Sequence, residues 1–222
     1  MVSNKKNLKD NMVVITTSLR NNIISNKRRE NLINNFNKYN IPILFNIGKK
    51  EQNKHFFELM RARLETFKKT KYDYAILCDD DFYPIDNFME ELMKTVELLP
   101  DNWECLHLCP GYLWGRKFRD KNKIGRLNPE YNMEGVQFHK SGRYYLKCNS
   151  KEYFNKNFWL GGPISILVNR NTVNKLLNAF VSMYNSENCN NDVVFTKILN
   201  NNSFICRQPQ LGYENEEGGS TF

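Results

Sequence analysis

The chain has 222 residues, of which 41% are hydrophobic and 13% aromatic, and its formal net charge is +8. This composition excludes a disordered or fibrous protein, and a chain of this length can bury a core of its own. No apolar run approaches the roughly 20 residues of a membrane span, and residues 1–11 are too polar for a secretory signal. The six cysteines form no C-x-x-C pair, so we expect free thiols and a cytoplasmic protein.

Two kinds of partner suit a basic chain, namely a nucleic acid and an anionic small molecule. The basic residues are spread along the chain, without an arginine-rich arm or a recognised nucleic-acid motif. This distribution favours an enzyme with an anionic substrate.

Strands and helices alternate in the first half of the chain. Residues 12–17 and 43–47 are β-rich runs, and Ser25 can cap the helix predicted between them. A second helix over 52–69 leads to a third strand over 74–78. This order is typical of an α/β fold, whose right-handed crossovers bring the strand ends to one edge of a sheet.

A polar loop is predicted at the end of the first strand. It includes two threonines, a serine and an arginine that suit the base, ribose or phosphate of a nucleotide: Thr16, Thr17, Ser18 and Arg20. An ordinary polar loop explains the same residues equally well. No G-x-G-x-x-G motif is present, which argues against a standard dinucleotide site.

Three consecutive carboxylates, Asp79, Asp80 and Asp81, follow the strand predicted over 74–78. They repel one another and are costly to pair with neighbouring protein groups, and ligands of open α/β sheets bind at this end of the strands. In an extended segment Asp79 and Asp81 point the same way. They therefore predict a site for Mg²⁺ or Mn²⁺, with Asp80 pointing elsewhere. The alternative is an acidic turn before a helix capped by Asp86.

The second half begins with a helix over 86–99 and a strand over 103–108. The segment 110–157 is long and irregular, which is typical of a functional loop or a covering flap. A strand over 164–168 and a helix over 172–184 follow.

Two glycines, Gly161 and Gly162, precede the strand over 164–168, where they permit close approach of a ligand or form a tight turn. Asp192 opens a helix over 193–199, either as its N-cap or as a general base in the same crevice. A last extended segment covers 204–206.

The order of these motifs resembles the GT-A nucleotide-sugar glycosyltransferases, and within them family 25, the lipooligosaccharide and collagen-type sugar transferases. The matching segments are residues 13–29, 73–81, 99–106 and 161–177, then Asp192, and finally Pro209 with Ser220. The chain departs from the family in two places. Its triplet starts with Asp79 instead of Glu, and a Gly-Cys…Ser-His segment is missing, so that Met60 or Arg61 falls near the position of that His.

The resemblance implies a single GT-A domain over 1–222, with a nucleotide-sugar-binding half at 1–110 and an acceptor-binding half at 111–222. It also implies that a hexose moves from a UDP-sugar to a hydroxyl of a glycan or glycoconjugate, with Mn²⁺ or Mg²⁺ on Asp79 and Asp81. The sugar, the linkage and the oligomeric state stay open.

Further roles follow from the resemblance. Asp80 would touch the donor ribose or sugar, and Arg61 and Arg63 would face the diphosphate. If the reaction inverts, as the resemblance favours, Asp192 would be the general base, a role typically worth ~10²–10⁴-fold in rate. If the reaction retains configuration, Asp192 would only orient the acceptor. Gly161 and Gly162 would admit the donor sugar, and Trp159 would offer a face to the acceptor.

Two other functions are compatible with the sequence. One is a carbohydrate- or RNA-binding module without catalysis. The other is a sugar nucleotidyltransferase, which needs a glycine-rich loop after the first strand, and residues 17–22 contain no glycine.

Overall fold

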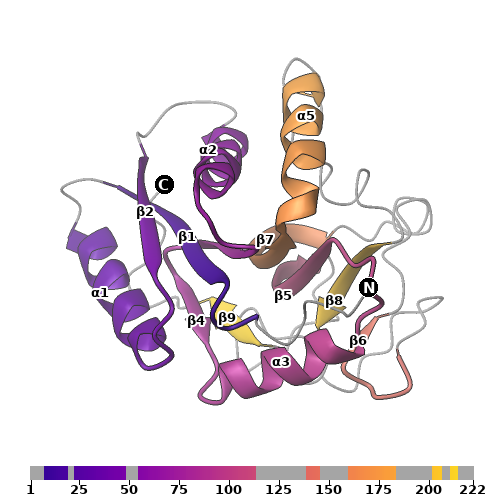
Figure 1. Ribbon diagram of the computed structural model, residues 1–222. Coiled ribbons are helices and arrows are strands. Elements are labelled where there is room, and N and C mark those ends of the chain that lie inside the picture. Colours follow the sequence, from indigo (N-terminus) through magenta and orange to yellow (C-terminus); the bar gives the residue numbers. More distant parts are fainter. Residues whose placement is uncertain are drawn as a thin grey trace.

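The computed structural model describes residues 8–19, 23–48, 55–113, 139–145, 160–183, 202–206 and 211–214. They form a seven-stranded sheet with helices on both faces (Figure 1). The predicted α/β class is therefore confirmed. In this part of the chain no helix is both long enough and apolar enough to cross a lipid bilayer.

The strand order in the sheet is β2-β1-β3-β7-β5-β8-β6. The strands are β1 (Met12–Leu19), β2 (Ile43–Gly48), β3 (Tyr74–Asp79), β5 (Cys105–Leu113), β6 (Tyr144–Tyr145), β7 (Leu160–Asn169) and β8 (Ser203–Cys206). As predicted, β1 is parallel to both β2 and β3. The sheet is mixed because β7 runs antiparallel to its two neighbours, β3 and β5.

Helices cover the two faces of the sheet in pairs. They are α1 (Ile23–Asn37), α2 (His55–Lys69), α3 (Phe88–Leu98) and α5 (Val173–Met183), the last preceded by the 3₁₀ turn η3 (Arg170–Thr172). In Figure 1, α2 and α5 lie above the sheet, and α1 and α3 lie below it. Alternation along the strands supplies both cores: Ile76 and Cys78 face α1 and α3, whereas Ala75 and Leu77 face α2 and α5.

The start of α1 differs from the prediction. The helix begins at Ile23, so Ser25 lies inside its first turn and is buried, and its assignment as the N-cap is wrong. Ser25 is followed on the buried side by Arg28, Leu32 and Phe36 at helical spacing. The buried face of the helix, which meets the sheet, therefore includes an arginine.

A two-stranded ribbon that the sequence analysis missed holds the chain beyond the acidic triplet. β4 (Phe82–Pro84) pairs antiparallel with β9 (Gly212–Glu214). The Phe82 ring is buried against Phe36 and Phe88. It also covers Gly212, where an added Cβ would lie 2.1 Å from a ring carbon of Phe82. The ribbon thus fixes the backbone directly after Asp81.

The two predicted glycines lie within a strand, not before it. β7 begins at Leu160, because its pairing with the long strand β5 extends to Leu113. Of the irregular segment 110–157, the structure describes only 110–113, which completes β5, and 139–145, which includes β6. The helix expected over 193–199 lies outside the described residues.

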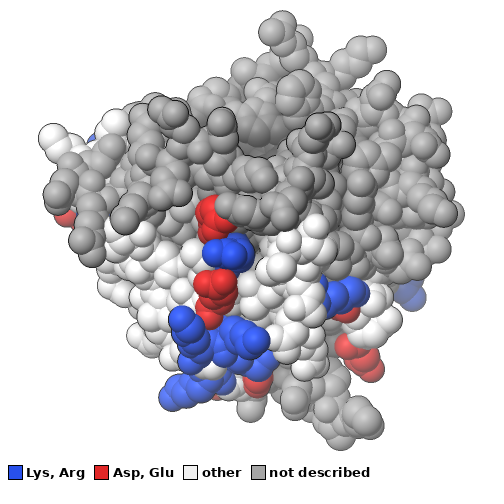
Figure 2. Space-filling model, turned by 90° about the horizontal axis from the view of Figure 1, so that it is seen from above, with Lys and Arg blue, Asp and Glu red and all other residues white. Residues whose placement is uncertain are grey.

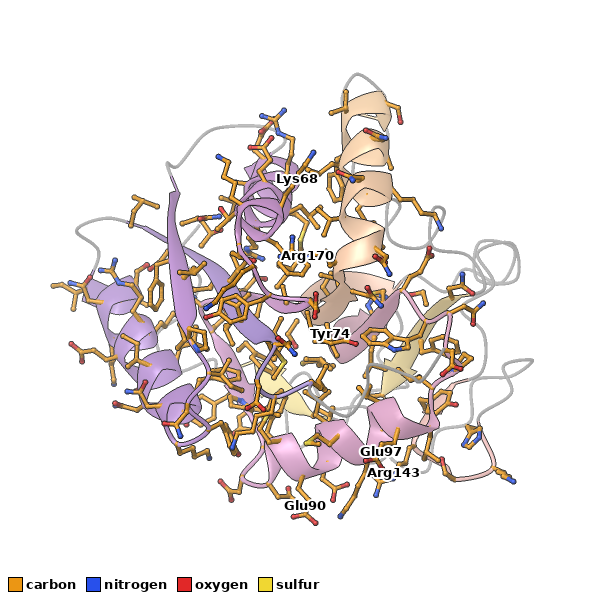
Figure 3. All side chains as sticks on the ribbon, in the orientation of Figure 1. Lys68, Tyr74, Glu90, Glu97, Arg143 and Arg170 are labelled. Atoms are coloured by element: carbon orange, nitrogen blue, oxygen red, sulfur yellow. The ribbon has the colours of Figure 1, made fainter. Side chains whose placement is uncertain are left out.

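Arg170 holds the C-terminal end of α2. Its guanidinium donates hydrogen bonds to the carbonyl oxygen of Phe67 in the last turn at 3.4 Å, and to those of Thr70 at 2.8 Å and Tyr72 at 2.5 Å just beyond the helix. It also lies over the Phe67 ring. Figure 3 shows Arg170 below the end of α2 that carries Lys68. A cation beside the last carbonyls of a helix is favourable, so this contact anchors the helix that supplies Arg63.

The 139–145 segment is attached to α3 and β8. Arg143 donates to the Glu91 carboxylate at 2.6 Å, and the Tyr144 hydroxyl donates to the Leu98 carbonyl at 2.6 Å. The hydrogen bond from Arg143, and then that from Lys94, lower the pKa of Glu91. Figure 3 places Arg143 beside α3, the helix that also carries Glu90 and Glu97.

The core also contains a neutral histidine. His107 is buried on β5, with Nε2 3.2 Å from the Ser203 hydroxyl. Burial lowers the pKa of His107 to about 4. The four cysteines in the described ranges, Cys78, Cys105, Cys109 and Cys206, are buried free thiols.

Candidate functional site

The acidic triplet stands at the end of β3, beside the end of β1. Thr17 pairs in register with Asp79, so the two strand ends meet at one edge of the sheet as predicted. β1 continues to Leu19, however, so Ser18 lies in the strand with Thr16 and Thr17 instead of in the loop after it. All three are buried.

Arg63 joins these two strand ends. Its Nε donates to the Thr17 hydroxyl at 3.0 Å, and its Nη2 donates to Asp79 Oδ1 at 2.6 Å. The residue follows Met60 on the side of α2 that faces the sheet, and only 2% of it is exposed. The Asp79 side chain is 39% exposed. Arg63 therefore fixes one side of Asp79 while the carboxylate still faces outward.

Arg28 pairs with the other two carboxylates. Its Nη1 lies 3.2 Å from Asp80 Oδ1 and 3.2 Å from Asp81 Oδ2. The strand ends at Asp79 and a turn follows, so the alternation that would align Asp79 with Asp81 stops there. Asp79 and Asp81 consequently contact different arginines, on α2 and α1 respectively. The expectation that Asp80 points away from Asp81 is wrong, since both contact Arg28.

The sequence analysis treats the three carboxylates as costly to pair with neighbouring protein groups, and the observed ion pairs correct this premise. The three carboxylates are matched by two buried guanidinium groups, so the protein does supply partners for them. Burial raises the pKa of Asp80, whereas the Arg28 guanidinium and the Ser18 hydroxyl act in the opposite direction. Burial also raises the pKa of the Cys78 thiol, which therefore stays protonated beside the triplet.

Sequence reasoning missed Arg28. A signal was present in the helical spacing, because Arg28 stands four residues before Leu32 and eight before Phe36, on the apolar side of α1. A charged residue on the buried face of a helix needs a partner of opposite charge. The nearby acidic triplet is that partner.

Arg61 does not share the position of Arg63. It lies two residues earlier on α2, which is about half a turn of the helix, and its side chain is 38% exposed. Its guanidinium pairs with Glu58 at 3.2 Å and Glu65 at 3.7 Å. The structure thus brings Arg63, and not Arg61, to the triplet.

Several predicted site residues are placed only by their backbone or not at all. Ser165 pairs with Cys78, so Gly161 and Gly162 lie on β7 beyond the last paired residue of β3, at the edge of the triplet. Arg20, Trp159 and Asp192 lie outside the described residues.

Charged side chains of both signs are mixed on the face shown in Figure 2, where acidic and basic groups follow one another along a band.

Within the described ranges, no three His, Cys, Asp or Glu side chains are arranged to hold a metal ion. A metal at the triplet would therefore take at most two ligands from this part of the chain.

No protein-family profile and no curated protein sequence matches the chain. One similar solved structure is that of a glycosyltransferase involved in the glycosylation of the major capsid of PBCV-1. The two sequences are 12% identical, the match covers 79% of this chain and 69% of that chain, and its TM-score is 0.42. Another is the apo form of mouse xyloside xylosyltransferase 1, with 13% identity, 84% and 81% coverage and a TM-score of 0.39. Both are glycosyltransferases, but similarity at this level does not carry an argument about this chain. The resemblance to family 25 stays a prediction.

Proposed function

We propose that this protein is a metal-dependent glycosyltransferase of the GT-A type, which moves a hexose from a UDP-sugar to a hydroxyl of a glycan or glycoconjugate. The observation that carries the proposal is the triplet Asp79–Asp81, held by two buried arginines next to Thr17, at the sheet edge where α/β proteins bind ligands. The ordered motifs of the sequence support the same activity.

The donor atoms suit the proposed metal. Asp79 and Asp81 offer only carboxylate oxygens, which are the ligands that Mg²⁺ and Mn²⁺ prefer. The Asp79 carboxylate uses Oδ1 for Arg63 and is partly exposed. Two protein ligands leave coordination positions for water and for the donor diphosphate. The ion would supply charge neutralisation of the diphosphate leaving group.

Charge counting supports metal dependence. With all three carboxylates ionised, the two guanidinium groups leave the cluster with one net negative charge. Such a cluster repels a diphosphate. A divalent cation changes the net charge to one positive, and the cluster then attracts the donor.

The residues of the chain would divide the remaining work. Arg63, bonded to Thr17, orients Asp79, and Ser18 lies beside Asp80. The end of β1 would therefore form one wall of the donor site. In this proposal Arg20 contacts the nucleotide, Trp159 contacts the acceptor, and Gly161 and Gly162 let the donor sugar approach β7. Asp192 takes the proton of the acceptor hydroxyl in an inverting reaction.

The test is calorimetric titration of UDP with and without Mn²⁺. We expect binding that needs the metal, a loss of at least tenfold in Asp81→Ala, and no change in Asp86→Ala, whose side chain is exposed five residues further along the chain. Hydrolysis of a panel of UDP-sugars then identifies the donor. Metal-independent binding of UDP, or no binding, would contradict the proposal and leave a carbohydrate- or RNA-binding module as the alternative.

A further inference from the structure

We propose that Arg28 is an internal counter-ion that competes with the metal for Asp81. It keeps the affinity of the triplet for a free divalent cation low, so that metal and diphosphate bind together. This inference rests on the proposed function and adds a residue that determines how the metal is taken up.

The position of Arg28 supports this role. One nitrogen, Nη1, lies 3.2 Å from oxygens of both Asp80 and Asp81. Its side chain is 7% exposed. The helix face that carries it is fixed in the core by Leu32 and Phe36. The guanidinium is therefore held between the two carboxylates by the fold.

The two arginines affect the proposed metal ligands unequally. Arg63 contacts Asp79, whose side chain is 39% exposed. The Asp81 side chain is only 15% exposed, and it shares the Arg28 guanidinium with Asp80. A divalent ion on Asp81 would stand within a few ångströms of the Arg28 charge, in a region that water screens weakly. Like charges at such a distance repel strongly.

The negative diphosphate would offset this repulsion. A metal that arrives with the nucleotide brings negative charge into the same place, so each ligand improves the binding of the other. Arg28 would therefore lower the affinity for the metal alone without weakening the joint binding of metal and diphosphate, because its fixed charge repels the metal and attracts the diphosphate.

The experiment measures Mn²⁺ binding by the electron paramagnetic resonance signal of the free ion, with and without UDP. Arg28→Met alone would leave Asp80 buried without its counter-ion, which can prevent folding. The informative pair is therefore Asp80→Asn and the double variant Asp80→Asn/Arg28→Met. Arg28→Lys retains the charge, and Arg61→Met removes an exposed arginine as a matched control.

We expect Asp80→Asn to weaken Mn²⁺ binding, because one of the two carboxylates that oppose the Arg28 charge is then lost. Removal of Arg28 in that background should tighten the binding of Mn²⁺ alone at least tenfold. Arg28→Lys and Arg61→Met should behave as wild type. A damaged fold cannot explain a gain in affinity.

Two other outcomes separate a failure of this inference from a failure of the proposed function. If the double variant binds Mn²⁺ alone no more tightly than Asp80→Asn does, the role of Arg28 as a competitor is overturned while the proposed function stands. If wild type binds no Mn²⁺ even with UDP, the proposed function fails, and this inference fails with it.

Discussion

Replacing Arg63 with methionine tests whether the bridge between β1 and β3 stabilises the edge of the sheet. The variant keeps most of the buried side-chain stem but loses the hydrogen bonds to Thr17 at 3.0 Å and to Asp79 at 2.6 Å. A neutral hydrogen bond contributes about 1 kcal/mol and one between charged groups about 1.5–3 kcal/mol. Water can rehydrate Asp79, because its side chain is 39% exposed, and this reduces the loss.

We therefore expect Arg63→Met to lower the free energy of unfolding by about 2 kcal/mol. For a chain of this size that corresponds to a decrease in Tm of roughly 4–8 °C. Urea denaturation at neutral pH, followed by circular dichroism, measures the difference. The matched control is Arg61→Met on the same helix, because its exposed pairs with Glu58 and Glu65 should contribute less than about 0.5 kcal/mol.

A double-mutant cycle with Asp79→Asn isolates the ion pair from other effects. If the bridge is as described, the two substitutions should be non-additive by about 1–2 kcal/mol. Equal destabilisation by Arg61→Met and Arg63→Met, or full additivity with Asp79→Asn, would refute the reasoning.

Three more substitutions examine other parts of the fold. Arg170→Met should lower the free energy of unfolding, measured by chemical denaturation, by about 2 kcal/mol, because the carbonyls at the end of α2 lose their charged donor. Lys175→Met removes an exposed ion pair and should lower it little. Equal losses would contradict the capping role. His107 has a folded pKa of about 4, below the ordinary 6.5, so its contribution is complete above pH 6.5 and decreases as the pH falls toward 4. The loss between pH 7.5 and 5.0 should be about 2 kcal/mol and should be absent in His107→Gln; an unchanged pH profile in that variant would refute it. Gly212→Ala should lower the free energy of unfolding by about 1–3 kcal/mol, because the new methyl group meets the Phe82 ring; a melting temperature equal to wild type would show that the ribbon can rearrange.

The parallel half of the sheet was predictable because its signals are local. The apolar runs at 12–17, 43–47 and 74–78 became β1, β2 and β3 with boundaries shifted by at most two residues. The helices between them require parallel crossovers, so the meeting of the strand ends at one edge of the sheet followed from topology. The direct pairing of Thr17 with Asp79 follows from the strand order, which required the structure.

The ribbon of β4 and β9 was not predictable in the same way. Each strand has three residues, and the partners Phe82 and Glu214 are separated by more than half of the chain. Short strands carry little periodicity, and their pairing depends on a tertiary contact, here the Phe82 ring over Gly212. Composition around either strand does not reveal it.

The candidate site was predictable in its acids, but of its two cations only Arg63 was named in advance and Arg28 was not. Three adjacent aspartates are visible in any sequence, and helical spacing places Arg28 on the same side of α1 as Leu32 and Phe36. Its contact with Asp80 and Asp81 depends on how α1 packs on the sheet and on the turn after Asp79. The geometry of the charged cluster therefore required the structure.

The central position of β7 has a consequence for synthesis of the protein on the ribosome. β3 and β5 flank β7 in the sheet, but both are translated long before residue 160. Until β7 emerges, each of them has an unpaired edge of backbone groups, and such edges are templates for association with other chains. The N-terminal β-α-β-α-β unit can collapse early, but the sheet closes only after a strand distant in sequence has inserted. The nascent chain is therefore expected to depend on chaperones, and to be most prone to aggregation, while residues 114–159 are being made.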